Sequence, residues 1–102
     1  MNVDMDKVRR ESIRWTILLT LNKGRPFPLY EERVLDVVQA IYADSTALEL
    51  RRELDYLDDR KLVGVVKEPG GRWRAELTHY GVDVAEYTVD CLPGIARPAK
   101  YW

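Results

Sequence analysis

The chain has 102 residues, of which 32% are charged and 46% belong to the hydrophobic set AVILMFWYC. This is the composition of one ordinary globular domain, and it excludes a disordered or collagen-like chain. Its 16 Lys and Arg residues against 17 Asp and Glu residues give a formal net charge of -1, which excludes a strongly basic nucleic-acid coat and a polybasic membrane anchor.

The first predicted helix spans residues 6–22. Its apolar residues recur at helical spacing and form one stripe: Ile13, Ile17, Leu18 and Leu21. Gly24 is expected to end the helix in the left-handed conformation that glycine tolerates. Residues 25–28 then form a linker, because their two prolines cannot continue a helix.

The second predicted helix runs from residue 29 or 30 to residue 42. Its apolar members are expected to form a buried stripe: Val34, Val37, Val38 and Ile41. Its polar members are expected to face water: Glu31, Glu32, Arg33, Asp36 and Gln39.

The third predicted helix begins near Thr46 and ends near Arg60. Thr46 and Glu49 have the spacing of a capping box, although Asp44 or Ser45 would also serve as the cap. Three leucines fall within a narrow arc at helical period and are predicted to turn inward: Leu50, Leu54 and Leu57.

The remaining chain predicts a β-hairpin, a last helix and a tail. Residues 62–67 and 72–78 are the strands, because one is a β-branched run and the other alternates in polarity. Alternation places Trp73, Ala75 and Leu77 on one face and Arg72, Arg74, Glu76 and Thr78 on the other. Residues 78–90 return to helical spacing. We therefore predict one domain over residues 1–90 and an irregular tail over residues 91–102, which is rich in proline and glycine.

Three helices, a hairpin and a closing helix resemble, in that order, the winged helix-turn-helix fold, an α+β architecture. Ser45-Thr46, the three leucines and Lys61-Leu62-Val63 resemble the family's recognition-helix pattern, although Lys61 stands where glycine is usual. Leu77-Thr78-His79-Tyr80-Gly81 resembles the Leu-Thr-x-x-Gly step that follows the hairpin, or wing, in MarR-like and PadR-like proteins. The resemblance covers residues 8–90 and implies DNA binding and regulation of transcription.

The short length and the tail, which ends in Lys100-Tyr101-Trp102, look like small winged-helix proteins of Mu-like transposable phages and prophages. This narrower resemblance implies a phage gene in a bacterial cytoplasm and no settled activity. A cytoplasmic location also fits the single Cys91, which cannot form an intramolecular disulfide. No membrane association is expected, because no apolar run approaches the ~20 residues that span a bilayer.

In a winged helix the third helix lies in the DNA major groove, with its outward face toward the bases. The residues predicted to lie opposite the three leucines are Ser45, Leu48, Arg52, Asp55, Tyr56 and Asp59. Arg52 is predicted to contact a guanine edge, and Ser45 or Thr46 a phosphate or a base. Double-stranded DNA is thus the expected partner.

The charge of this helix opposes that expectation. Residues 46–59 hold five acids and two bases, a net charge of -3, and phosphate neutralisation supplies much of the affinity for DNA. An alternative therefore stays open, namely a winged-helix protein-interaction module without DNA binding. Its acidic third helix and aromatic tail would contact a protein partner, such as another phage protein.

The hairpin offers a more favourable DNA contact. Arg72 and Arg74 share a face beside a turn with two glycines, and Lys67 is near them on the partner strand. We predict that these three cations bind phosphates, although basic side chains on a hairpin are also common solvated residues. Trp73 points the other way and is predicted to lie in the core.

Catalysis and cofactor binding have little support in the sequence. His79 and Cys91 are each unique, and their spacing does not suggest a nucleophile and base within hydrogen-bond reach. No ligand spacing indicates a metal site, and no glycine-rich phosphate loop lies between a strand and a helix. The sequence therefore predicts a protein that is not an enzyme and has no cofactor.

Aromatic residues suggest a contact between two copies of the chain. Trp15 lies off the apolar stripe of the first helix, and Tyr101 and Trp102 end the tail. Large aromatic side chains anchor protein interfaces, and winged-helix regulators often dimerise through their first or last helices. Trp15 and the tail are therefore predicted to form a homodimer contact, unless the tail folds back on its own domain.

Overall fold

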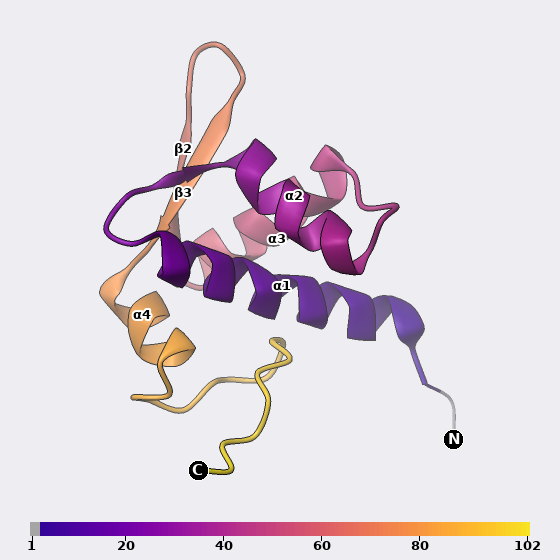
Figure 1. The fold of residues 1–102 in the computed structure, drawn as a ribbon, viewed down its shortest axis with the longest axis vertical. Helices are drawn as coiled ribbons and strands as arrows, with labels where there is room; N and C mark the ends of the chain where they lie inside the picture. Colours follow the sequence, from indigo (N-terminus) through magenta and orange to yellow (C-terminus); the bar gives the residue numbers. More distant parts are fainter. Residues whose placement is uncertain (1–2) are drawn as a thin grey trace.

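The computed structural model describes residues 3–102, and within them it shows four helices and a three-stranded antiparallel sheet (Figure 1). In chain order the elements are α1 (Met5–Gly24), β1 (Leu29–Tyr30), α2 (Glu31–Ile41), α3 (Ala47–Asp59), β2 (Val63–Lys67), β3 (Trp73–Leu77) and α4 (His79–Ala85). The predicted α+β class and the predicted order of three helices, hairpin and helix are confirmed. Strand β1 was not predicted; the strand order in the sheet is β1-β3-β2.

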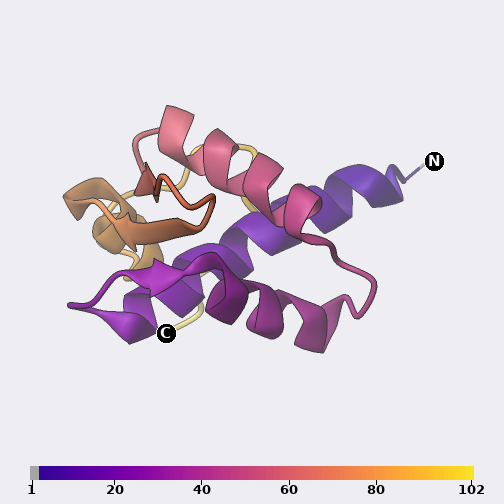
Figure 2. The ribbon, with the colours of Figure 1, turned by 90° about the horizontal axis from the view of Figure 1, so that it is seen from above.

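Helix α1 is the central element and packs against α2, α3, α4 and β3. Its N-terminus is capped by Asp4, whose carboxylate accepts the Lys7 N–H at 3.1 Å. The predicted stripe is confirmed, because Ile13, Ile17, Leu18 and Leu21 are all buried. Figure 2 shows that the N-terminal end of α1 projects beyond the other elements.

Helix α1 ends at Gly24, but not by the predicted left-handed glycine. The positive-φ glycines are Gly71 and Gly94, and the turn closes instead with the Arg25 N–H donating to the Asn22 carbonyl at 3.3 Å. A Cβ on Gly24 would lie 3.0 Å from the Leu29 side chain. Gly24 therefore serves close packing against the residue that starts β1.

Helix α2 begins later than predicted because Leu29 and Tyr30 pair with Ala75 and Arg74 of β3. Its predicted buried stripe is half correct: Val34 and Val38 are buried, whereas Val37 and Ile41 are 41% and 60% exposed. Helix α2 packs against α1, α3, β1 and β3, and these contacts leave Val37 and Ile41 uncovered. Glu31, predicted to face water, is 7% exposed, and this correction matters for the site.

Helix α3 follows the prediction closely. The Thr46 hydroxyl accepts the Glu49 N–H at 3.2 Å, which confirms this cap. The Glu49 carboxylate does not complete the capping box, because it binds Arg9 of α1 instead. Leu50, Leu54 and Leu57 are buried in the core, as predicted.

Strands β2 and β3 form the predicted hairpin, with Val65 opposite Ala75 and Lys67 opposite Trp73. Lys61, in the turn before β2, has a φ of 67°, so this turn holds a side chain where glycine would be unstrained. Helix α4 ends at Ala85 and not at residue 90, because Tyr87 also adopts a positive φ of 63°.

The chain after α4 has no further helix or strand in the described residues, and it folds back beneath α1 (Figure 1). The Ala96 N–H donates to the Glu11 carbonyl of α1 at 3.1 Å. The Arg97 guanidinium donates to the Val84 and Val89 carbonyls at 3.1 and 2.9 Å. No helix among residues 3–102 combines the length and the apolar character that crossing a membrane requires.

Candidate nucleic-acid interface

The outer face of α3 is the surface that the sequence predicts to meet DNA. Leu48, Arg52, Asp55 and Asp59 are exposed along one stripe, on the side away from the three buried leucines. Two other residues predicted on this face are not there. Ser45 is buried, and Tyr56 is half-buried with the Arg14 guanidinium 3.5 Å from its ring centre.

Ser45 holds the turn before α3 and does not face outward. Only 4% of it is exposed, its hydroxyl accepts a hydrogen bond from Arg9 at 3.3 Å, and its carbonyl accepts one from Gln39 at 2.8 Å. The prediction that Ser45 faces DNA is therefore wrong, because the turn packs against both α1 and α2. Thr46 is exposed, and its hydroxyl oxygen is the cap of α3.

The three cations predicted on the hairpin each lie beside a carboxylate. Arg72 pairs with Glu32 at 3.1 Å, Lys67 with Asp55 at 3.3 Å, and Arg74 with Glu68 at 3.4 Å. Arg72 donates to both carboxylate oxygens of Glu32, at 3.1 and 3.3 Å. The side chains of all three pairs are between 30% and 57% exposed. The hydrogen bond from Arg72 lowers the pKa of the Glu32 carboxyl. The hairpin is therefore basic in sequence but locally neutralised in the fold.

A buried ion pair that the sequence did not indicate ties the hairpin to α2 and α3. Arg51 of α3 donates to both carboxylate oxygens of Glu31 at 2.7 Å and to the Gly71 carbonyl at 2.6 Å. Glu31 also accepts the Trp73 N–H at 2.6 Å. The bonds from Arg51, followed by the Trp73 N–H, lower the pKa of Glu31 against the opposing effect of burial.

Arginines of α1 compensate the acidic residues on the other flank of α3. Arg9 donates to Glu49 at 2.8 and 2.9 Å, and its bonds lower the pKa of that carboxyl. Arg14 donates to Glu53 at 2.7 Å and to the Gly94 carbonyl at 2.8 Å, in a site where the Glu53 side chain is only 5% exposed. The spacing of acids within α3 gave no sign of these partners, because both arginines lie on another helix.

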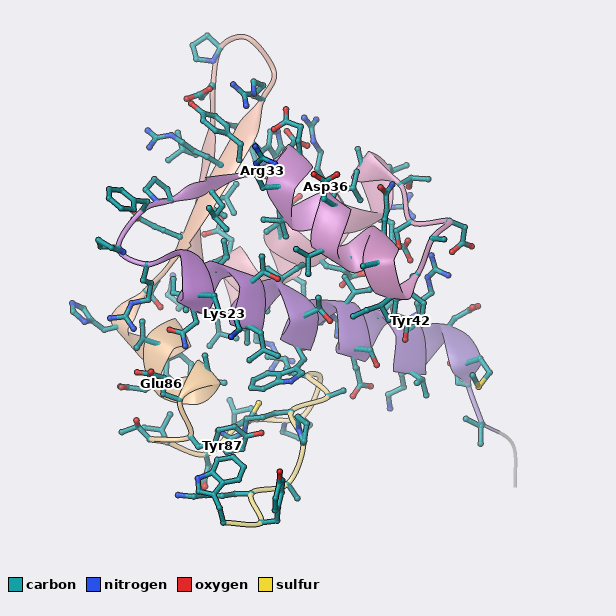
Figure 3. The ribbon with its side chains drawn as sticks, viewed as in Figure 1. Lys23, Arg33, Asp36, Tyr42, Glu86 and Tyr87 are labelled. Atoms are coloured by element: carbon teal, nitrogen blue, oxygen red, sulfur yellow. The ribbon has the colours of Figure 1, made fainter. Side chains whose placement is uncertain are left out.

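The aromatic residues of the tail gather on their own domain. The ring centre of Tyr87 lies 5.9 Å from Trp15 and 4.8 Å from Trp102, both in edge-to-face geometry. Figure 3 labels Tyr87 beneath α1, where its hydroxyl donates to the Pro98 carbonyl at 2.8 Å. Trp15 is half-buried, whereas Tyr101 and Trp102 stay 90% and 68% exposed. The tail thus folds back and still presents two aromatic rings to solvent.

His79 and Cys91 lie in different surroundings. His79 is exposed at the start of α4, and Cys91 is half-buried with its Sγ 3.6 Å from the Leu92 carbonyl. Burial raises the pKa of the Cys91 thiol, which disfavours the nucleophilic thiolate. In the part of the chain that the structure describes, no three His, Cys, Asp or Glu side chains group as a metal site would.

Comparison with known proteins identifies a related fold. No protein-family model and no curated protein match this sequence. The structure is similar to the crystal structure of a "putative DNA-binding protein" from Ralstonia eutropha JMP134, with a TM-score of 0.64 and 22% sequence identity. The match covers 87% of this chain and 100% of that chain. At this level of identity the two proteins share a fold.

Proposed function

We propose that this chain is a small winged-helix DNA-binding protein, in which α3 enters the major groove and the β2–β3 hairpin is the wing. The observation that carries the proposal is the exposed outer stripe of α3 lying directly beside a hairpin with three cations. The Lys67–Asp55 contact shows how close these two surfaces are. The fold shared with the Ralstonia protein, itself described as a "putative DNA-binding protein", supports the same assignment.

In this proposal Arg52 and Thr46 address the major groove, with Arg52 suited to a guanine edge and Leu48 to a thymine methyl. Lys67, Arg72 and Arg74 contact phosphates. Their carboxylate partners do not prevent this, because exposed ion pairs contribute little and exchange readily for another anion. Ser45 has no direct contact, because it is buried.

The ion pairs also reduce the charge problem of α3. Of its five acids, Glu49 and Glu53 are paired with arginines of α1, and Asp55 is paired with Lys67. Among residues 3–102 no cation pairs with the other two acids, Asp58 and Asp59, which lie at the C-terminal end of the helix. The N-terminal half of α3, which leads into the groove in winged-helix complexes, is therefore less acidic than its sequence indicates.

The resemblance to MarR-like, PadR-like and Mu-like phage proteins adds a biological setting to the proposal. We propose a regulator of transcription or a DNA-handling accessory, encoded by a phage or prophage and acting in the bacterial cytoplasm. A homodimer through Trp15, Tyr101 and Trp102 would bring two copies of α3 to neighbouring half-sites. The exposure of the last two residues supports such a contact.

A second candidate is a protein-interaction module without DNA binding. It is favoured by the pairing of all three hairpin cations with carboxylates, which leaves the hairpin with little net charge. The exposed Asp58 and Asp59, together with the aromatic tail, would then contact a protein partner, such as another phage protein.

Binding to a fluorescent random-sequence duplex, measured by anisotropy at 50 and 200 mM salt, separates the two candidates. If three hairpin cations each cover one phosphate, affinity should fall by about 40-fold between these concentrations. The double variant Arg72→Ala/Arg74→Ala should bind more weakly with a smaller salt dependence. Lys23→Ala, an exposed cation on α1, is the control (Figure 3). No binding by the wild-type protein at 50 mM salt would favour the interaction module.

A further inference from the structure

An open cleft lies between the N-terminal half of α1 and the outer side of α3. Its volume is about 320 Å³, and its lining residues are Asp6, Arg9, Arg10, Glu49, Arg52 and Glu53. All six are charged, which sets this cleft apart from the apolar packing elsewhere along α1. The sequence did not suggest it, because it exists only where α1 packs across α3.

The lining holds three acids and three arginines, but not every arginine is paired with an acid. Arg9 pairs with Glu49 and also with Asp44, at 2.8 and 2.9 Å. Glu53 pairs with Arg14, and this pair is largely buried. Within residues 3–102, neither Arg10 nor Arg52 forms an ion pair or a side-chain hydrogen bond. Arg10 and Arg52 are therefore the guanidinium groups of the lining that are left to bind an anion, with the Asp6 carboxylate in the same lining.

The cleft lies on the flank of α3 opposite the hairpin. Arg51, on one flank of the outer stripe, contacts Gly71 in the hairpin turn, whereas Glu49, on the other flank, contacts Arg9 of α1. Figure 2 shows the N-terminal end of α1 and the hairpin on opposite sides of α3. The outer stripe with Arg52 therefore runs between the cations of the hairpin on one side and the cleft that contains Arg10 on the other.

This arrangement matches the two walls of a major groove. The groove is about 12 Å wide, an α-helix with its side chains is about 10–12 Å across, and a phosphate strand borders each side. A helix seated there brings both of its flanks to the backbone. When the hairpin contacts the phosphates of one DNA strand, the cleft faces the phosphates of the other DNA strand.

We propose that Arg10 and Arg52 together bind one phosphate group of the DNA backbone in this cleft. The planar guanidinium fork suits bidentate contact with phosphate oxygens, and two forks from different helices fix the position of that phosphate. The inference rests on the proposed DNA binding and revises it at Arg52, which contacts a phosphate here and not a guanine edge. Arg10 becomes part of the interface.

The test measures duplex binding by Arg10→Gln, Arg52→Gln and the double variant at 50 and 200 mM salt. Each single variant should lose one phosphate contact, so its affinity should depend less on salt. Between 50 and 200 mM salt, the factor by which its affinity falls should be about threefold smaller than the factor for the wild type. Because both arginines hold the same phosphate, the double variant should lose little more than either single variant. Two duplexes of different sequence should show the same losses.

Lys23→Gln is the matched control, because it removes one exposed positive charge from α1 about 20 Å along the helix from Arg10. Circular dichroism should show the same fold for every variant. The proposal is overturned if Arg10→Gln and Lys23→Gln bind the duplex with the same affinity. It is also overturned if the affinity losses of the two single variants add in the double variant, or if Arg52→Gln alone changes the preference between the two duplex sequences. Failure of the wild type to bind any duplex would instead overturn the proposed function, and the cleft assignment with it.

Discussion

Two kinds of ion pair surround α3, and they differ in burial more than in chemistry. The carboxylates of Glu31 and Glu53 are 8% and 5% exposed, and each joins elements far apart in the sequence. Those of Glu32 and Asp55 are 57% and 53% exposed and meet hairpin cations at the surface. A buried carboxylate has no substitute partner, whereas an exposed one competes with water and salt. The buried pairs therefore fix the fold, and the exposed pairs leave cations available to a ligand.

The strongest test of the difference between buried and exposed positions uses two adjacent residues on α3. Leu54→Asp should cost about 5 kcal/mol or more, because it removes a buried side chain and adds an unpaired buried charge. That is comparable with the whole stability of a small domain, about 5–15 kcal/mol, so the variant should be unfolded by circular dichroism. Asp55→Asn, on the exposed side, should melt like the wild type. Equal tolerance of both changes would contradict the placement of α3.

Glu53→Ala tests the buried class of ion pair directly. It should destabilise the domain by about 3–5 kcal/mol, because it leaves Arg14 buried without its carboxylate. Urea denaturation followed by circular dichroism measures the change. Glu32→Ala, which removes the exposed partner of Arg72, should leave the unfolding midpoint almost unchanged. If the two variants were equally stable, burial would not explain how much each ion pair contributes to the stability of the fold.

The sequence predicted those parts of the fold that depend on neighbouring residues. Helical spacing identified the stripe of α1 and the three leucines of α3, and the Thr46 cap followed from its type and position. Strand β1 was missed because its two residues pair only with a strand more than 40 positions away. Val37 was placed inside because helical spacing does not show how much of a helix its neighbours cover.

The sequence predicted most of the residues that form the candidate site, but it did not predict the contacts that these residues make. Arg52 and the hairpin cations Lys67 and Arg72 lie at the surface, as expected, but the carboxylate partners of Lys67 and Arg72 come from other elements. The Arg14–Glu53 contact spans 39 positions, so no local pattern indicates it. Ser45 was misplaced because its burial depends on the packing of its turn against α1 and α2. Arg10 gains a role only from the cleft that tertiary packing creates.

Acid titration should reveal the contribution of the buried pair at Glu31. Its pKa is lowered in the folded chain from the ordinary value of 4.5, so its pair with Arg51 stabilises the fold above pH 4.5 and is lost as the pH falls below it. Urea denaturation between pH 7 and pH 3 should show Glu31→Gln less stable than the wild type at pH 7. The difference should shrink below pH 4.5, because the unfolded chain then takes up a proton at Glu31 before the folded chain does. Glu76→Gln, an exposed control, should show no such convergence.

The smallest expected effect concerns the exposed pairs and the binding of DNA. Glu32→Gln removes the carboxylate that competes with phosphate for Arg72, and it should raise affinity for a random duplex by about two- to fivefold at low salt. Asp36→Asn is the control, because Asp36 lies one turn further along α2 (Figure 3) and forms no ion pair within residues 3–102.

Anisotropy titration at 50 mM salt should show a gain for Glu32→Gln that exceeds the gain for Asp36→Asn, because only the first change frees a hairpin cation. In the background of Arg72→Ala the gain from Glu32→Gln should disappear, since no cation is then released. An equal gain for both single variants would mean that total charge, and not the exchange of one carboxylate for a phosphate, governs binding at the hairpin.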